Sequence, residues 1–151
     1  MNRKKFTIFL CLFIISLYLT ACASNNKSDI SSKDLKNASP QKLVEIYYNS
    51  LSKGDYKTAK SCLSTEYANQ FSSTSDSDFK NLVKITDIKV SPEAAIKLYN
   101  RNYDEVQVTA EYNAEYKKVI TVPNGKQIRF IYVAKKEKDS PWKIISIGTG
   151  P

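Results

Sequence analysis

Cysteine is the residue type in this chain with the clearest potential for chemistry. The sequence of 151 residues contains three cysteines, Cys11, Cys22 and Cys62, and no histidine. Without an imidazole, histidine acid–base catalysis and histidine-ligated metal sites are excluded. Cys62 falls in the apolar register of a predicted helix, so we expect a small buried hydrophobe rather than a reactive thiol. Cys22 stands where an apolar run gives way to polar residues, and its surroundings define its chemistry.

Residues 1–21 have the organisation of an export signal. Three basic residues at positions 3–5 precede an apolar run over 6–19, which is shorter than the ~20 residues of a bilayer-spanning helix. The Leu-Thr-Ala-Cys stretch at 19–22 closely resembles the lipobox of bacterial lipoproteins. This resemblance implies that a diacylglyceryl group is attached to the sulfur of Cys22, which becomes the first residue after cleavage. Two acyl chains make a stable anchor, so we expect a cell-membrane protein on the extracytoplasmic face. Simple secretion is the alternative.

The polar stretch that follows predicts a tether. Residues 22–39 are rich in serine and asparagine and contain only two large apolar residues, so we expect them to be disordered. The formal net charge of +8 falls to +5 when Arg3, Lys4 and Lys5 are removed with the signal. Such a balance suits lipid headgroups or cell-wall polymers, but the even spread of lysines favours a simple role in solubility. We expect no nucleic-acid partner.

Two helices are predicted to open the folded domain at 40–151. Ser39 and Pro40 are a capping hydroxyl and a proline at the first helical position. Apolar residues then recur at helical spacing up to Gly54, where the helix should end. Asp55 can cap a second helix that carries Cys62.

The second half of the domain predicts an antiparallel sheet. From Leu82 the apolar period changes to two, with a strand ending at Ser91, a helical turn or loop over 93–98, and a long strand over 106–116. Pro-Asn-Gly at 123–125 predicts a three-residue hairpin loop. That loop would pair Ile120 with Ile128, Tyr116 with Tyr132 and Ala114 with Ala134. A final strand follows Pro141.

Several short motifs do not support a catalytic or ligand site. The Asp-x-Asp pair at 76–78 lies in a polar stretch at 72–79 that lacks the glycine and ligand positions of a calcium loop, so we expect a solvated connection. The Gly-Thr-Gly at 148–150 has no helix after it and is not a phosphate loop. Glu111 and Glu115 fall on the polar side of their strand, so no buried catalytic base is indicated. We predict no catalytic residue, metal site or cofactor.

Aromatic residues on the predicted strands are the best candidates for a binding cavity. Tyrosine offers both a flat apolar face and a hydroxyl, although aromatic residues at alternating strand positions more often build a core. The candidate cavity-lining residues are Tyr112, Tyr116, Phe130, Tyr132 and Trp142.

The two ends of the predicted domain resemble known families. The helical segment at 39–59 looks like the opening of nuclear transport factor 2-like (cystatin-like) domains. The closing segment at 141–151 resembles the carboxyl-terminal signature of small bacterial lipoproteins grouped as domain of unknown function 4829. The resemblance implies an α+β fold in which a curved antiparallel sheet wraps the amino-terminal helices into a cone.

The resulting functional expectation is a membrane-anchored, non-catalytic binding or interaction module. Its partner would be a small apolar ligand or an envelope protein. The first alternative is a small isomerase- or hydrolase-like enzyme that uses the cone cavity. The second is a protein for envelope stress or immunity to antimicrobial peptides, suggested by location and basicity.

Overall fold

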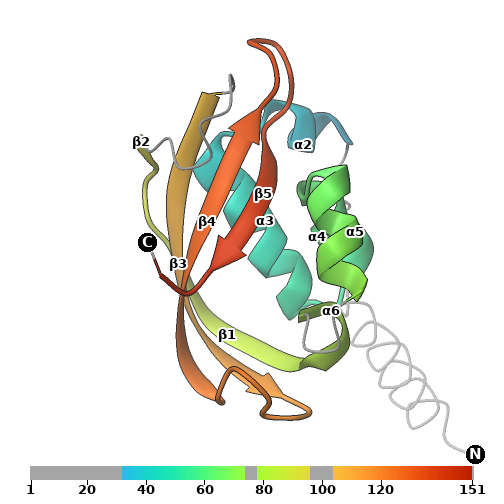
Figure 1. Ribbon diagram of the computed structural model, residues 1–151, viewed down its shortest axis with the longest axis vertical. Coiled ribbons are helices and arrows are strands. Elements are labelled where there is room, and N and C mark those ends of the chain that lie inside the picture. Colours follow the sequence, from blue (N-terminus) through green and yellow to red (C-terminus); the bar gives the residue numbers. More distant parts are fainter. Residues whose placement is uncertain (1–31, 74–77, 96–103, 151) are drawn as a thin grey trace, which may run out of the picture.

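The computed structural model describes residues 32–73, 78–95 and 104–150. These residues form an α+β domain in which helices pack against one face of an antiparallel sheet (Figure 1). The predicted signal segment and Cys22 lie outside the described residues. Within the described part of the chain, no helix combines the length and the apolar character that crossing a bilayer requires.

The helices precede the main strands. They are α2 (Ser32–Asn37), α3 (Pro40–Ser52), α4 (Tyr56–Cys62), α5 (Thr65–Ser73) and α6 (Asp78–Asn81). The predicted helix starts are confirmed, because the side chains of Ser39 and Asp55 accept hydrogen bonds from backbone amides three residues later, at 3.2 and 3.1 Å. Gly54 follows α3 with φ +70°, a left-handed conformation that favours glycine.

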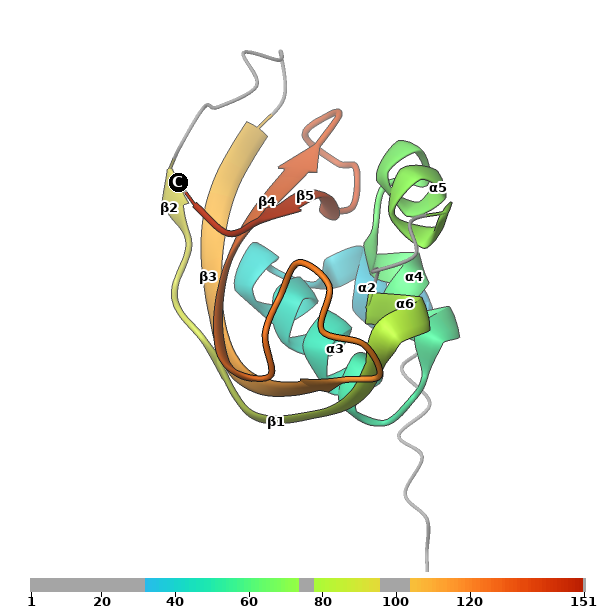
Figure 2. The same ribbon diagram turned by 60° about the horizontal axis from the view of Figure 1, so that its bottom comes forward.

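The sheet has five strands. These are β1 (Leu82–Val90), β2 (Ala94–Ala95), β3 (Asp104–Tyr116), β4 (Gly125–Lys135) and β5 (Lys143–Gly148). The order is β1-β3-β4-β5, every pairing is antiparallel, and β2 pairs with the first part of β3. Figure 2 shows that the long strands curve around α3, so that this helix lies inside the curve of the sheet.

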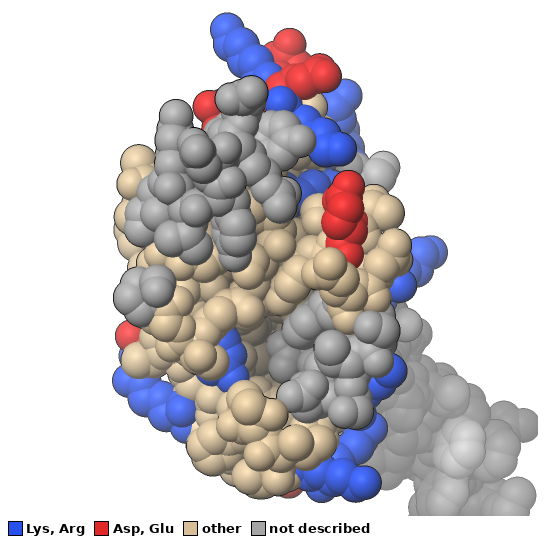
Figure 3. All heavy atoms as spheres, viewed as in Figure 1, with Lys and Arg blue, Asp and Glu red and all other residues tan. Residues whose placement is uncertain are grey.

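The hydrophobic core lies between α3, α4 and the concave face of the sheet. Tyr47 and Tyr48 of α3 are fully buried, and the ring of Tyr48 lies 4.8 Å from that of Tyr112 on β3, between centroids. The alternation predicted for 106–116 is confirmed from Val108 onward. Cys62 belongs to this core, as predicted. Lysine and arginine atoms are spread around the edges of the face drawn in Figure 3.

The predicted register of the β3–β4 hairpin is wrong. The observed pairs include Ala114 with Gly125 and Gln107 with Tyr132, instead of Tyr116 with Tyr132 and Ala114 with Ala134. The connection is not a three-residue loop but runs from 117 to 124. Asn81 binds the backbone of Lys118 in both directions, at 2.8 and 3.0 Å, and so holds the chain beyond Tyr116 in a wide excursion. Ile120 therefore lies in the connection and has no partner in the β3–β4 ladder.

Three predicted loop segments contain secondary structure. Helix α2 lies within the segment predicted as a tether, where Leu35 packs against the core and Ala38 is buried. Parts of the polar stretch at 72–79 belong to α5 and α6. Residues 94–95 form β2 rather than a helical turn, because they complete the ladder of β3 beyond the end of β1. Residues 22–31, 74–77 and 96–98 lie outside the described residues.

Candidate binding cleft

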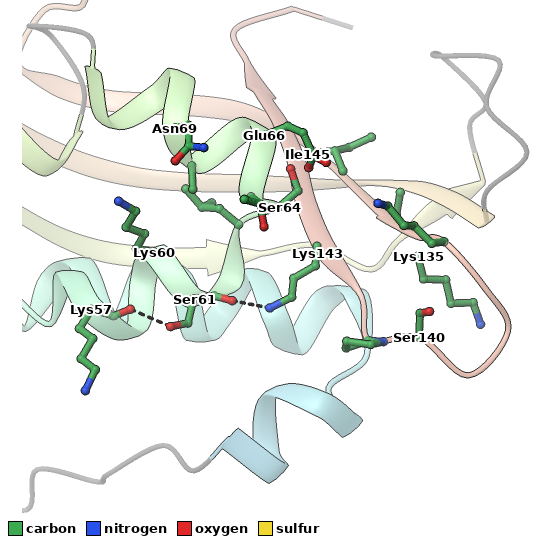
Figure 4. Close-up of a pocket in the computed structure, with 16 residues that line it drawn as sticks. Lys57, Lys60, Ser61, Ser64, Glu66, Asn69, Lys135, Ser140, Lys143 and Ile145 are labelled. Carbon is green, nitrogen blue, oxygen red and sulfur yellow. Dashed lines mark hydrogen bonds between the residues drawn. The ribbon is translucent and has the colours of Figure 1, made fainter.

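A cleft of about 820 Å³ lies between α4, α5 and the strands β4 and β5. Figure 4 shows the residues that line it: Ser64, Glu66 and Lys143 lie between the helices and β5, whereas the side chain of Lys57 extends away from them. We call it the basic cleft and define it by its lining residues: Lys57, Lys60, Ser61, Leu63, Ser64, Thr65, Glu66, Ala68, Asn69, Ala134, Lys135, Lys136, Ser140, Pro141, Lys143 and Ile145.

The cleft is built where the edge strand β5 is tied to the α4–α5 junction. Leu63 forms a parallel bridge with Ile144, and the backbone amide of Ser64 donates to the carbonyl of Ile144 at 2.8 Å. The amide of Ile147 donates to the hydroxyl of Tyr67 at 3.1 Å. These bonds satisfy part of the outer edge of β5, which would otherwise expose unpaired backbone groups. The α4–α5 junction and β5 are therefore joined directly by hydrogen bonds along one side of the cleft.

Positive charge dominates the lining. Five lysines line the cleft: Lys57 and Lys60 on α4, Lys135 and Lys136 at the end of β4 and directly after it, and Lys143 on β5. Glu66 is the sole carboxylate among the lining residues. In the part of the chain that the structure describes, no ion pair joins Lys57, Lys60 or Lys136 to a carboxylate. Their charge is available to a ligand.

Two of the five lysines are held in place by the protein itself. Lys143 donates from Nζ to the carbonyl of Ser61, which ties β5 to α4 (Figure 4). Lys135, whose side chain is 18% exposed, lies 3.3 Å from Asp104 and 5.0 Å from the centroid of the Trp142 ring. Cation–π and ion-pair contacts of this kind fix the position of a flexible lysine. These two residues therefore shape the cleft more than they offer free charge.

The remaining lining is apolar or carries hydroxyls. Leu63, Ala68, Ala134, Pro141 and Ile145 supply apolar surface, and four hydroxyl residues supply small hydrogen-bonding groups. The lining contains no cysteine, histidine or tyrosine, and the hydroxyl of Ser61 donates to the carbonyl of Lys57 at 2.9 Å. Among the described residues, no group of three or more His, Cys, Asp or Glu side chains is placed to hold a metal ion. This chemistry suits reversible binding of an anion with an apolar part.

The structure does not bring the five predicted aromatic residues together. Tyr112 and Tyr116 are buried on the helix-covered face of the sheet. Phe130 and Tyr132 pair with Thr109 and Gln107, so they share the opposite face. Trp142 precedes β5 and is half-buried beside Lys135. The observed β3–β4 register differs from the predicted one by an odd number of residues, which puts Phe130 and Tyr132 on the face opposite Tyr112. None of the five aromatic residues lines the basic cleft.

Cys62 has the environment of an inert thiol. It is fully buried, its Sγ donates to the carbonyl of Thr58 at 3.4 Å, and burial raises its pKa to about 12. Nearby Lys143 lowers the pKa by less than burial raises it. The thiol is therefore protonated at neutral pH.

One buried carboxylate was missed by the sequence analysis. Glu105 of β3 is 6% exposed, and its Oε1 has no hydrogen-bond partner among the described atoms. It lies on the same sheet face as Tyr132. Its position in the polar phase of the strand predicts exposure, so the local pattern carries no signal for it.

The lysines of the cleft were also missed as a set. They occur at 57–60 and 135–143, far apart in the sequence, and each group alone looks like an ordinary solvated set of charges. The only available signal was the basic run around the turn before β5. The pairing of β5 with the α4–α5 junction makes these segments neighbours.

The sequence matches the model of one protein family. The model of a family described as "Domain of unknown function (DUF4829)" matches residues 41–148, so the protein belongs to this family. The match confirms the family resemblance that the closing segment predicted. No curated protein and no solved structure matches the sequence.

Proposed function

We propose that the protein is a membrane-anchored extracytoplasmic lipoprotein whose single domain is a non-catalytic module that binds an anionic ligand. The observation that carries this proposal is the basic cleft, with five lysines, one carboxylate and a volume of about 820 Å³. The resemblance of residues 19–22 to a lipobox supports the anchor at Cys22. The proposal refines the expected small apolar ligand into one with both an apolar and an anionic part.

Charge and shape favour a ligand of this class. Like charges that line one concave surface raise the local potential, and an anion relieves their mutual repulsion. Lys57 and Lys60 are exposed lining residues on α4 that can meet a charged group, while Leu63 and Ile145 can pack against an apolar one. Small-molecule sites commonly combine apolar walls with a few polar groups.

The nuclear transport factor 2-like cone is part of the same proposal. It is supported by a curved antiparallel sheet around α3 (Figure 2) and by the helix–Gly–Asp–helix opening of the domain. In this arrangement the concave face is filled by core side chains such as Tyr48 and Tyr112. A binding role is thereby moved to the edge of the sheet, at β5.

Anion binding can be measured with the trisulfonated dye pyranine. The full-length protein is placed in zwitterionic nanodiscs, and the fluorescence anisotropy of the dye is followed. We expect the double variant Lys57→Gln/Lys60→Gln to raise Kd by about tenfold, the equivalent of ~1.4 kcal/mol. The control Lys33→Gln/Lys53→Gln removes the same charge from exposed positions outside the cleft. Equal losses in both variants, or no binding by the wild type, would contradict the proposal.

The enzyme alternative has one specific observation in its favour. Glu105 is a buried carboxylate on the same sheet face as Tyr132, the kind of pair that could act as a base and an oxyanion donor. The basic cleft does not include either residue. The binding proposal therefore has the better-defined site. An activity lost in Glu105→Gln but retained in Lys57→Gln/Lys60→Gln would favour the enzyme.

A further inference from the structure

The β3–β4 connection at residues 117–124 exposes large aliphatic side chains. Val119 is 61% exposed and Ile120 is 56% exposed, although both are large hydrophobic residues. Val83 in β1 and Ile128 in β4 are also exposed, at 55% and 44%. Val83 follows Leu82, which pairs with Tyr116 at the start of this connection. An apolar group at the end of a domain indicates a contact surface.

The connection is held in its shape by hydrogen bonds to buried or half-buried groups. The side chain of Asn81, which is 7% exposed, both donates to and accepts from the backbone of Lys118. The backbone carbonyl of Asn81 accepts from the amide of Lys117 at 2.8 Å. At the other end, Asn124 accepts from the amide of Tyr116 at 2.8 Å, and Gln127 donates to the carbonyl of Pro123 at 2.7 Å. The aliphatic tip is therefore presented in a preorganised form, which lowers the entropy cost of binding.

Lysines surround the aliphatic tip. Lys117 and Lys118 precede Val119 directly, and Lys84 and Lys126 lie on the adjacent strands. Glu111 is paired with Lys126 at 2.9 Å, and Glu115 lies opposite Lys84 in the ladder, so the end as a whole remains positive. Figure 3 shows uncharged atoms at the lower end of the molecule with lysine or arginine atoms on both sides.

We propose that residues 117–120 dock the domain onto the surface of an anionic lipid bilayer, with Val119 and Ile120 entering the interface and the lysines contacting headgroups. Apolar side chains ringed by lysines match such a surface in both polarity and charge. A second copy of this end would instead bring like charges together.

The chain between Cys22 and the domain limits how far the tip can lie from the bilayer. The proposal rests on the lipid anchor proposed for Cys22. Ser32, the first residue of α2, is ten residues after that cysteine, so the chain between them spans at most about 33–36 Å. The domain would then remain within that distance of the bilayer. Because Figure 1 draws α2 near the end opposite the tip, contact of the tip with the bilayer requires this segment of chain to extend along the domain. Figure 1 places the tip and the β4–β5 connection at opposite ends of the molecule. Docking through the tip therefore leaves the rim of the basic cleft formed by that connection directed away from the membrane.

The test places a fluorescent probe at the tip. In full-length Ile120→Cys, nitrobenzoxadiazole is attached to the new thiol, and the protein is reconstituted into vesicles that contain spin-labelled lipid quenchers. Lys138→Cys, exposed in the β4–β5 connection, carries the matched control probe. Buried Cys62 should remain unlabelled in the folded protein. We expect the tip probe to be shifted to the blue and quenched at least twofold more than the control in vesicles containing phosphatidylglycerol.

The composition of the vesicles and a charge variant decide the outcome. Lys118→Glu in the Ile120→Cys protein should abolish the difference from the control probe. A tip probe that behaves like the control on anionic vesicles would overturn the proposal, as would equal quenching in pure phosphatidylcholine. A blue shift that grows with protein concentration without vesicles would assign the tip to self-association instead. Labelling of the wild-type chain reports on the anchor separately, because a Cys22 without an acyl chain takes up the probe.

Discussion

At the scale of single residues, burial decides what the polar groups of this protein can do. Cys62 is a thiol in the apolar face of α4, and burial raises its pKa to about 12. Its reactive thiolate is therefore almost absent at neutral pH.

Cys62 should be unreactive in the folded protein. In full-length Cys11→Ala/Cys22→Ala, we expect no reaction with Ellman's reagent at pH 8 over the time in which a free thiol reacts completely. One equivalent should react after unfolding in guanidinium chloride, which serves as the control. Rapid modification in native buffer would show that the α4 face opens readily.

Asn81 should be a strong contributor to stability. Its side chain makes two hydrogen bonds to the backbone of Lys118, and it is buried. Replacing it with Ala removes both hydrogen bonds to the connection, so Asn81→Ala should lower the free energy of unfolding by about 1–3 kcal/mol, as measured by urea denaturation. The matched control is Asn49→Ala on the exposed surface of α3, which should change it by less than ~0.5 kcal/mol. Equal effects of the two substitutions would contradict the assigned role of Asn81.

At the scale of elements, a side-chain hydrogen bond is formed where the pairing of β1 with β3 is irregular. The register between β1 and β3 shifts between Thr86 and Lys89, where Asp87 has φ +55°. Its carboxylate accepts a 2.7 Å hydrogen bond from Asn113. That bond, followed by one from Thr86, lowers the pKa of Asp87 below its ordinary value of 3.8.

Asp87 should contribute an acid-sensitive part of the stability. Because the folded state has the lower pKa, its contribution is present above about pH 3.8 and is lost as the pH falls through the folded value. Asp87→Asn keeps a residue that tolerates the left-handed backbone but removes the titration. The difference in unfolding free energy between wild type and variant should therefore change between pH 5 and pH 2. A constant difference over this range would refute the assignment. Asp139→Asn, exposed in the β4–β5 connection, is the control.

At the scale of the whole molecule, the proposed anchor and the two proposed surfaces belong to one arrangement. The anchor would hold the domain near the membrane, the tip at 117–120 would orient it, and the basic cleft would face outward. Each proposal can be disproved independently of the other, because anion binding by the cleft is measured on zwitterionic lipid and docking of the tip is measured by a probe at residue 120.

The lipid anchor should depend on one cysteine. Cys22→Ala should abolish incorporation of a fatty-acid probe in a bacterial host that processes lipoproteins, because the proposal makes its sulfur the acylated atom. Cys11→Ala should retain it, since that residue lies in the segment that the proposal assigns to a cleaved signal. A Cys22→Ala protein that stays membrane-bound and labelled would disprove the anchor.

Local chemistry explains how much of the fold could be predicted. Ser39, Pro40, Gly54 and Asp55 act within a few residues of their own positions, so both helices and their ends could be recognised. The buried phase of β3 from Val108 was equally clear, because one face meets the helices and the other does not.

Strand β4 shows why the register could not be predicted. Ile131 and Val133 are buried on the helix side, and Tyr132 and Ala134 are buried on the other, so hydrophobicity does not distinguish the two phases. Gln127 is buried on the helix side although it is polar, because its amide is bonded to the Pro123 carbonyl. A shift of one residue exchanges the faces of a strand, and this is what separated the candidate aromatic residues.

The sequence by itself thus determined the helices α3 and α4 with their caps, the buried phase of β3, the inert Cys62 and the family. Only the tertiary structure decided the β3–β4 register, the exposed tip and the basic cleft. The physical reason is distance along the chain. Asn81 acts on Lys118, and Ser64 acts on Ile144, through contacts that no local pattern encodes.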